Sequence, residues 1–470
     1  MNRDPASFPG TPARAGRIAL VGILAAAVLG ALRTRESALR LLEKNRVFLD
    51  AGLPALPGPG HLETLASWAP PAAGAVFFGL SLGLGTAAVL GVAVATARML
   101  PGRVGRSAPW LVLALPAAAW AYGDPQLALF LLCASAATLV WTHPPRDRRS
   151  VLLRAAAGAV AALGLVPWAR APEGAFTRVR DRILLAAPSG PGLWMNHLYY
   201  RWTLYPAEVL KPLDARSQPW VRPELPGPER LSFCRQVLRF GALCADGPPG
   251  AADVVAHRAG DRIILEADGV RVPWPSDPVQ QGKSWRWLAR DADRARALRR
   301  ATALALFAGG PIALAWTLGG IALRVGSWIP GRRKRVLFVL LCAGLLGGAV
   351  AAASIPPPWL RGARHLAASS RAPPEADVDS LLRSPRPVLR LYGARLASRL
   401  GPRGESWLLR ALEDPVINVR YTAALGLGRT GGARARQALL GLLGSRGEWY
   451  VKERAYAALW RMGWRPGGIR

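Results

Sequence analysis

Long apolar runs dominate the hydrophobic pattern of this 470-residue chain. A transmembrane helix needs about 20 predominantly apolar residues to cross a hydrocarbon core ~30 Å thick. The runs that approach this length are 18–32, 72–97, 108–122, 126–141, 151–168, 301–325 and 336–355. The pattern therefore predicts a mainly α fold built on a polytopic transmembrane helical bundle, with about five helices in residues 1–168 and about two more in residues 301–355.

The first run, 18–32, has a second interpretation. It follows a basic start formed by Arg3, Arg14 and Arg17, and a basic start before a short apolar run also describes a secretory signal peptide. No clear A-x-A cleavage site follows the run, so an uncleaved anchor is the favoured interpretation. The choice between a cleaved signal and an anchor decides how many helices the mature bundle contains.

Arginine and lysine in the short loops predict the topology, because these residues stay on the cytoplasmic side of a membrane. Basic clusters follow the second, fourth and sixth runs, at residues 98–106, 146–149 and 332–335. If the helices alternate in direction, these clusters and the basic N-terminus lie on one side. We therefore expect a multi-pass protein of a bacterial inner membrane with a cytoplasmic N-terminus. The segments that then lie outside the cytoplasm are residues 33–71, 123–125, 169–300 and the C-terminal tail.

Residues 169–300 form a polar extramembrane insert, for which we expect an α+β fold. Its second half alternates apolar and polar residues around Ala-Gly-Asp and Ala-Asp-Gly turns, which predicts a small antiparallel β meander at residues 252–273. Its first half holds an aromatic cluster with interleaved charge, a candidate binding surface because Tyr and Trp combine an apolar body with a polar edge. The cluster comprises Trp194, Tyr199, Tyr200, Arg201, Trp202 and Tyr205. An interfacial aromatic belt and the core of the insert are the alternatives.

After a linker at 356–375, the last part of the chain repeats itself. Leu389, Val419 and Val451 share a position at spacings of 30 and 32 residues, as do Arg390, Arg420 and Lys452, and Gly401, Gly431 and Gly463. A leucine-rich segment precedes each copy, so each repeat is expected to contain two helices, with the glycine ending the second one. Self-similarity at a fixed period indicates a solenoid. We therefore expect an α-solenoid of about three repeats in residues 376–470.

The middle copy, Glu413-Asp414-Pro415 followed by Val419-Arg420, Ala423-Ala424 and Leu427-Gly428, resembles HEAT-like repeats, including the short type found in phycobilin lyases. The resemblance implies a helical solenoid that binds other proteins, and it does not imply lyase activity. It also implies that Arg390 and Arg420 are structural ladder residues, each bonded to a neighbouring turn. We accordingly do not treat these two arginines as binding residues.

The net charge of the chain is large, but it alters these predictions little. The chain has 61 basic and 29 acidic residues and a net charge of +32. Such an excess is typical of proteins that bind nucleic acid or an anionic membrane surface. The basic residues are spread through loops and repeats, without a compact basic domain or a recognised nucleic-acid motif. We therefore expect a lipid bilayer and a protein as partners, and no nucleic acid.

The sequence offers little candidate chemistry. No Asp, Glu or His lies in the middle of an apolar run, and the motifs of metalloproteases, serine hydrolases and nucleotide-binding loops are absent. We expect no catalytic residues, no metal and no cofactor. Cys234 and Cys244 lie in the insert and form a disulfide if it faces an oxidising compartment, or else remain two buried thiols.

These observations favour an integral membrane scaffold whose HEAT-like repeats bind a protein partner at the cell envelope. A transporter or a transporter subunit is the first alternative, because Gly309, Gly310 and Pro311 interrupt the sixth run and a broken helix can mark a transport site. A membrane enzyme that acts on lipid or glycan at the outer leaflet is the second alternative. It would require an acid/base pair that the sequence does not reveal.

Overall fold

The computed structural model describes residues 10–58, 62–97, 113–121, 123–141, 180–181, 184–185, 190–248, 250–310, 312–313, 358–369, 371–445 and 448–466. The chain divides into two compact units. The first unit comprises residues 1–33, 74–175 and 296–356, and the second comprises residues 34–73, 176–295 and 357–470. Predicted runs 151–168 and 336–355 lie outside the described residues, and 108–122 and 301–325 are described only in part.

Helices make up the described part of the first unit. They are α1 (Gly10–Asp50, to residue 33 in this unit), α2 (Ala69–Phe78), η2 (Gly79–Gly83), α3 (Leu84–Ala97), a helix at 113–121, α5 (Pro125–Trp141), α11 (Arg296–Leu304) and η5 (Ala305–Gly309). Glycines allow these helices to cross closely. A Cβ on Gly83 would lie 2.5 Å from the carbonyl oxygen of Gly22, and one on Gly309 would lie 2.1 Å from that of Gly85. Larger residues at these crossings would force the helices apart.

Two described helices are long and apolar enough to span a membrane, at Gly16–Asp50 and Ala69–Val94, and a shorter apolar helix runs over Pro125–Val140. The second of these is not a regular α-helix throughout, because η2 is a π-helical segment. The helix that contains the predicted interruption at 309–311 is also π-helical, over Ala305–Gly309. Residue 311 itself lies outside the described residues.

Helix α1 is longer than the apolar run that predicted it. The run ended at residue 32 and the following segment was expected to be an extramembrane loop, whereas the helix continues to Asp50. The helix does not end at residue 32, and only its hydrophobic pattern changes there. Ala38, Leu41, Asn45 and Phe48 recur every three or four residues and are all buried, so this part of α1 is an amphipathic helix that belongs to the second unit.

A five-stranded sheet forms the centre of the insert. Its strand order is β2-β1-β3-β4-β5, with β1 parallel to β2 and β3 and with antiparallel pairs β3–β4 and β4–β5. The strands are β1 (Trp220–Glu224), β2 (Leu243–Cys244), β3 (Val254–Ala259), β4 (Arg262–Ala267) and β5 (Val270–Trp274). The last three are the strands expected between residues 252 and 273. Strands β1 and β2 were not predicted, because β1 contains Pro223 and β2 has only two residues.

Helices of the insert pack against this sheet. The insert contains α8 (Pro191–Leu210), η3 (Leu213–Ala215), α9 (Gly227–Val237), η4 (Leu238–Phe240) and α10 (Pro278–Asp291). Helix α10 packs on β5 and β4 through Trp285 and Leu288, which share a buried core with Val221, Phe233 and Leu265. A short η1 (Leu62–Leu65) and the end of α1 complete the part of the second unit that precedes the repeats.

The C-terminal segment is an all-helical stack. It contains α14 (Pro358–Ala368), α15 (Glu375–Leu382), α16 (Pro387–Ala397), η6 (Gly401–Gly404), α17 (Glu405–Ala411), α18 (Ile417–Thr430), α19 (Ala433–Gly444) and α20 (Trp449–Arg461). The repeated glycines have positive φ, 60° at Gly401, 70° at Gly431 and 79° at Gly463, as helix-terminating residues should. Part of the predicted linker is helical, since α14 lies within it. This helix buries Leu360 and Ala363 and packs against α16.

Candidate functional site

The repeat stack has two helical layers, and consecutive repeats are joined by an arginine ladder. Arg390 donates from Nε to Asp414 of the next repeat at 2.6 Å and from a terminal nitrogen at 3.1 Å, and it also donates to the carbonyl of Ser384. Arg420 donates to the carbonyl of Asp414 at 2.6 Å and to the carboxylate of Glu448. Each arginine thus ties its own turn to the turn of the following repeat, the structural role that the resemblance implied.

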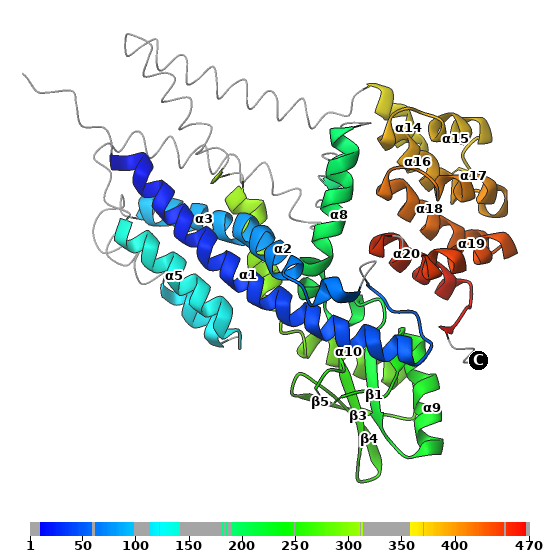
Figure 1. The fold of residues 1–470 in the computed structure, drawn as a ribbon, viewed down its shortest axis with the longest axis horizontal. Coiled ribbons are helices and arrows are strands. Elements are labelled where there is room, and N and C mark those ends of the chain that lie inside the picture. Colours follow the sequence, from blue (N-terminus) through cyan, green and yellow to red (C-terminus); the bar gives the residue numbers. More distant parts are fainter. Residues whose placement is uncertain are drawn as a thin grey trace, which may run out of the picture. The chain divides into compact units, whose positions relative to one another are not determined.

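The layer formed by α16, α18 and α20 is not free in this chain. We call its insert-facing side the inner face, formed by Arg395, Ile417, Asn418, Tyr421, Trp449, Tyr450 and Glu453. Helix α8 of the insert contacts α18 and α20 (Figure 1). Leu184, Leu185 and Tyr200 share one buried core with the repeats. The indole of Trp449 donates to the carbonyl of Tyr200 at 2.6 Å, within the buried interface.

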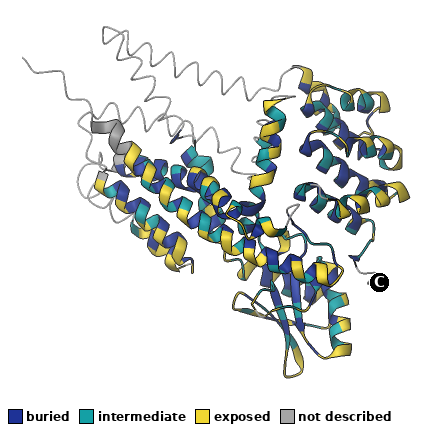
Figure 2. Cartoon of the chain, viewed as in Figure 1, coloured by how far each residue is buried: buried dark blue, intermediate teal, exposed yellow. Residues whose placement is uncertain are grey.

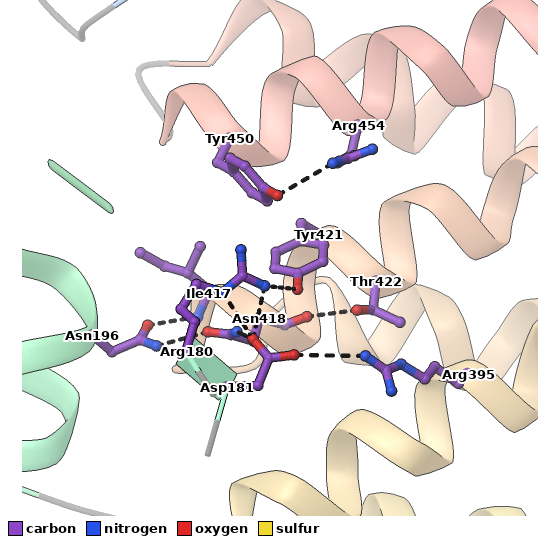
Figure 3. A network of polar contacts seen from close by, with 10 residues as sticks. All are labelled: Arg180, Asp181, Asn196, Arg395, Ile417, Asn418, Tyr421, Thr422, Tyr450 and Arg454. Carbon is purple, nitrogen blue, oxygen red and sulfur yellow. Dashed lines mark hydrogen bonds and ion pairs between the residues drawn. The ribbon is translucent and has the colours of Figure 1, made fainter. Parts of the chain in front are cut away.

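A polar network lies at the centre of the inner face (Figure 3). The Asn418 amide donates to the carboxylate of Asp181 at 2.7 Å and accepts a hydrogen bond from Asn196 at 2.7 Å. The Asn196 carbonyl oxygen accepts the backbone N–H of Ile417 at 3.3 Å. The carboxylate of Asp181 lies 3.6 Å from the guanidinium of Arg395 on α16. Since Asn196 and Asn418 are both almost fully buried, each depends on the other to satisfy its amide.

Aromatic rings surround this network. Arg180 donates to the hydroxyl of Tyr421 at 2.9 Å, and its guanidinium lies over the rings of Tyr200 and Tyr421 at 5.7 and 5.9 Å from their centroids. Burial raises the pKa of Tyr421. Burial alone would also raise the pKa of Tyr450, but the guanidinium groups of Arg454 and Arg180 outweigh it and lower that pKa. The arrangement is a packed, hydrogen-bonded protein interface within one chain.

Two helices per repeat and a ladder between consecutive repeats characterise an α-solenoid. Residues 378–460 match the family of HEAT repeats. No curated protein and no solved structure matches the chain. HEAT repeats generally mediate protein–protein interaction, and here the inner face of the repeats binds the insert of the same chain. The finer resemblance to the phycobilin-lyase type remains a prediction.

A second polar cluster fixes the end of α8 to the last repeat. Lys211 donates to Glu208 at 2.5 Å and to Glu453 of α20 at 2.8 Å, and Ser217 donates to the same Glu453 carboxylate. Both carboxylates are less than a tenth exposed. Burial alone would lower the pKa of Lys211, but the two carboxylates reverse the effect and raise it. The lysine therefore remains charged between two buried acids.

The six residues of the predicted binding surface have different environments. Tyr200 and Tyr205 are buried, the first against the repeats and the second beside Leu204 and Trp449, so neither belongs to a surface. Tyr199 is partly buried against the repeat core, and burial raises its pKa to about 12. Trp194, Arg201 and Trp202 are exposed on α8, with the Trp194 side chain 62% exposed. A binding role remains a prediction for these three residues.

The residues of the inner-face network were not predicted from the sequence. Asn418 lies among Ile417 and Val419, which are fully buried, and a polar residue inside an apolar helix face is a signal that could have marked it. Arg180, Asp181 and Asn196 carried no such signal, because their partners lie more than 200 positions away in the sequence.

A disulfide joins Cys234 on α9 to Cys244 on β2, with a Cα–Cα distance of 5.8 Å. Of the other two cysteines, Cys133 of α5 is free, and Cys342 lies outside the described residues. Within the described ranges, no group of three or more His, Cys, Asp or Glu side chains is placed to hold a metal ion. The most extensive polar network in the described part of the chain is therefore at the inner face of the repeats, where it joins them to the insert of the same chain.

Proposed function

We propose that this protein is an integral scaffold of the bacterial inner membrane whose HEAT repeats hold a protein partner at the cell envelope. The match of residues 378–460 to HEAT repeats, on a chain with two helices long enough to span a membrane, carries the proposal. The first unit serves as the anchor and the second unit as the extramembrane binding part.

Exposed apolar side chains support the anchoring role of the first unit. Leu20, Leu24, Val28 and Leu32 of α1 are each more than half exposed and recur every four residues, so they form one stripe along the helix. Figure 2 shows exposed residues along this helix. Leu129 and Val140 of α5 are exposed to a similar degree. A soluble protein rarely exposes a continuous apolar stripe of this kind to water, whereas lipid chains solvate it without cost.

The set of chain segments that forms the second unit supports the predicted topology. Segments on opposite sides of a membrane cannot fold together. The second unit gathers residues 34–73, 176–295 and 357–470, and these are the long segments that the distribution of Arg and Lys assigned to the extracytoplasmic side. Arg33 also pairs with Asp124 at 2.6 Å, joining the end of the first predicted span to the turn expected on that same side. The grouping of these segments in one unit supports the proposal that they share a compartment.

The outer layer of the repeats is the surface that we assign to the partner, because the inner face already holds α8. This layer comprises α15, α17 and α19, and it exposes Arg410, Arg434, Arg436 and Leu440. Arg410 has a carboxylate partner in Asp379, whereas no carboxylate among the described residues pairs with Arg434 or Arg436. The layer therefore favours an acidic protein partner that also provides an apolar contact.

Reporter fusions test the compartment. Alkaline phosphatase and a fluorescent protein that folds only in the cytoplasm are fused in turn after residue 468 of the full chain. We expect phosphatase activity without fluorescence. Fluorescence without phosphatase activity would place the repeats in the cytoplasm and would refute the topology.

Site-specific photo-crosslinking tests the partner surface. A photoreactive residue replaces Leu440 on the outer layer, and the matched control replaces Leu231 of α9, which is 67% exposed outside the repeats. We expect a discrete cross-linked product from position 440 only, and its loss with Arg434→Glu/Arg436→Glu. Truncation of the repeats is a poorer test, because it would expose the buried side of α8. Equal products from both positions, or a product that survives the charge reversal, would contradict the assigned surface.

A further inference from the structure

Helix α10 carries an outer stripe that the scaffold role does not use. Val279, Lys283, Arg286, Trp287 and Arg290 are exposed and recur along one side of the helix, whereas Trp285, Leu288 and Ala289 are buried in the core that α10 shares with the sheet. Val279 is 67% exposed and Trp287 is 46% exposed. A helix that turns a valine and a tryptophan towards solvent, between cations, has a second face available for contact.

Three cations and the indole of this stripe line one shallow hollow. Lys283, Arg286, Trp287 and Arg290 line this open hollow of about 270 Å³. Arg290 pairs with Asp291 at 2.8 Å, and the Trp287 indole donates to the same carboxylate. Arg286 donates to the carbonyl of Gly282 at 3.1 Å, and neither it nor Lys283 has a carboxylate partner among the described residues. The hollow therefore presents positive charge beside an aromatic ring, and a phosphate group would complement it.

The position of α10 in the chain favours a lipid as the source of that phosphate. The helix ends at Asp291, and α11 begins at Arg296 and continues into the apolar run that starts at residue 301. The eleven residues from Arg290 to that run reach at most about 36–40 Å even when fully extended. If the run enters the bilayer, α10 lies within this distance of the membrane surface. An aromatic residue between cations is also the composition of helices that lie in the interfacial plane.

We propose that the outer stripe of α10 lies on the surface of an anionic bilayer, with Val279 and Trp287 at the headgroup boundary and the three cations on phospholipid phosphates. The proposal rests on membrane anchorage of the first unit and adds a second, peripheral contact. This contact would hold the sheet of the insert in a fixed orientation against the membrane. It would also make the orientation depend on anionic lipid.

Spin-label depth measurements on the full chain test this contact. Cys133 and Cys342 are replaced by alanine, the Cys234–Cys244 disulfide is kept, and one label is attached at Val279→Cys. The protein is reconstituted in vesicles of phosphatidylcholine alone, and in vesicles with about one third phosphatidylglycerol. A label at Leu80→Cys, on the apolar surface of the first unit, reports membrane anchorage, and a label at Leu231→Cys, on α9, is the aqueous control.

We expect the label at 279 to collide more often with oxygen than with a water-soluble nickel complex in the anionic vesicles, and the reverse in phosphatidylcholine. Lys283→Gln/Arg286→Gln/Arg290→Gln should return the label to an aqueous environment in the anionic vesicles, since each cation contributes about a fivefold effect on binding. These substitutions are at exposed positions, so the label at 231 should not change.

The other outcomes are distinguishable. An aqueous label at 279 in anionic vesicles, with a lipid-exposed label at 80, would overturn the α10 contact and leave anchorage intact. Aqueous labels at both 279 and 80 would refute membrane anchorage itself, and the contact with it. A label at 279 that is immersed to the same extent without anionic lipid, or with the cations removed, would overturn the proposed headgroup binding.

Discussion

The amide of Asn418 is the most informative single group in the inner face of the repeats. It joins Asp181 and Asn196, which belong to two different segments of the insert, to helix α18. Asn418→Ala removes both hydrogen bonds without adding bulk to the interface. We expect α8 to separate from the repeats more often in this variant, while the repeats themselves stay folded.

The structure sets the size of this effect. Asn196 is 1% exposed, so the loss of its partner leaves a buried amide donor unsatisfied, at a cost of about 1–3 kcal/mol. The loss at Asp181 is smaller, about 1 kcal/mol, because Arg180 still donates to the same carboxylate at 2.7 Å. The sum of about 2–4 kcal/mol corresponds to an increase of roughly 30- to 1000-fold in the opening equilibrium of the interface.

Hydrogen exchange of the full chain, measured by mass spectrometry, is the assay. The amides of α8 and of the first turns of α18 should lose protection by that factor, whereas the amides of β3, β4 and β5 should not change. Gln437→Ala removes an amide from the exposed side of α19 and is the matched control, with no change expected in α8. Asn196→Ala combined with Asn418→Ala should cost less than the sum of the single changes, because the pair is lost only once.

Unchanged protection of α8 in Asn418→Ala would refute the reasoning. It would mean either that the buried network contributes no net stability, or that the inner face is not occupied by α8 in the protein. The double variant separates these two cases, since additive effects of Asn196→Ala and Asn418→Ala would show that the two amides do not interact.

Other contacts of the second unit give further expected outcomes. Arg390→Ala should destabilise the repeats by about 1.5–3 kcal/mol in thermal unfolding, because charged hydrogen bonds to the next repeat are lost, whereas Arg383→Ala, which loses an exposed pair, should cost less than about 1 kcal/mol. Lys211→Met should cost about 3–5 kcal/mol in urea unfolding, because two buried carboxylates lose their cation, and exposed Lys283→Met should have little effect. Since the pKa of Lys211 is raised, its contribution is fully present below the ordinary value of 10.5 and is lost only as the pH rises through the higher folded value, so a difference that fades between pH 7 and 9 would contradict the assignment. Cys234→Ser opens the loop to Cys244 and should cost about 2–3 kcal/mol, an effect that reduction of the wild-type protein should reproduce in calorimetry.

The local patterns of the sequence were sufficient for the elements with a strict period. The spacing of Leu389, Val419 and Val451 predicted two-helix repeats, and the match to HEAT repeats confirms a HEAT-like solenoid there. Alternation of apolar and polar residues predicted strands between 252 and 273, and β3, β4 and β5 lie there. In each case the signal is local, because residues a few positions apart share a face of one helix or one strand.

The same local reasoning placed the boundary of α1 wrongly. The end of an apolar run was taken as the end of a helix, although Ala38, Leu41, Asn45 and Phe48 keep the helical period beyond it. It also missed β1, since a five-residue strand with a proline carries little period-two signal. β1 forms in spite of this because β2 and β3 pair with it on both sides.

By itself, the sequence determined that the chain is mainly helical, that it has long apolar runs and that it ends in HEAT-like repeats, because hydrophobic period and length decide these features within short windows. Only the tertiary structure decided that residues 34–73, 176–295 and 357–470 form one unit and that the inner face of the repeats binds α8. The physical reason lies in the pairing of buried polar groups. Asn196 and Asn418 satisfy each other across 222 positions, and such a pairing depends on how distant helices pack rather than on any pattern near either residue.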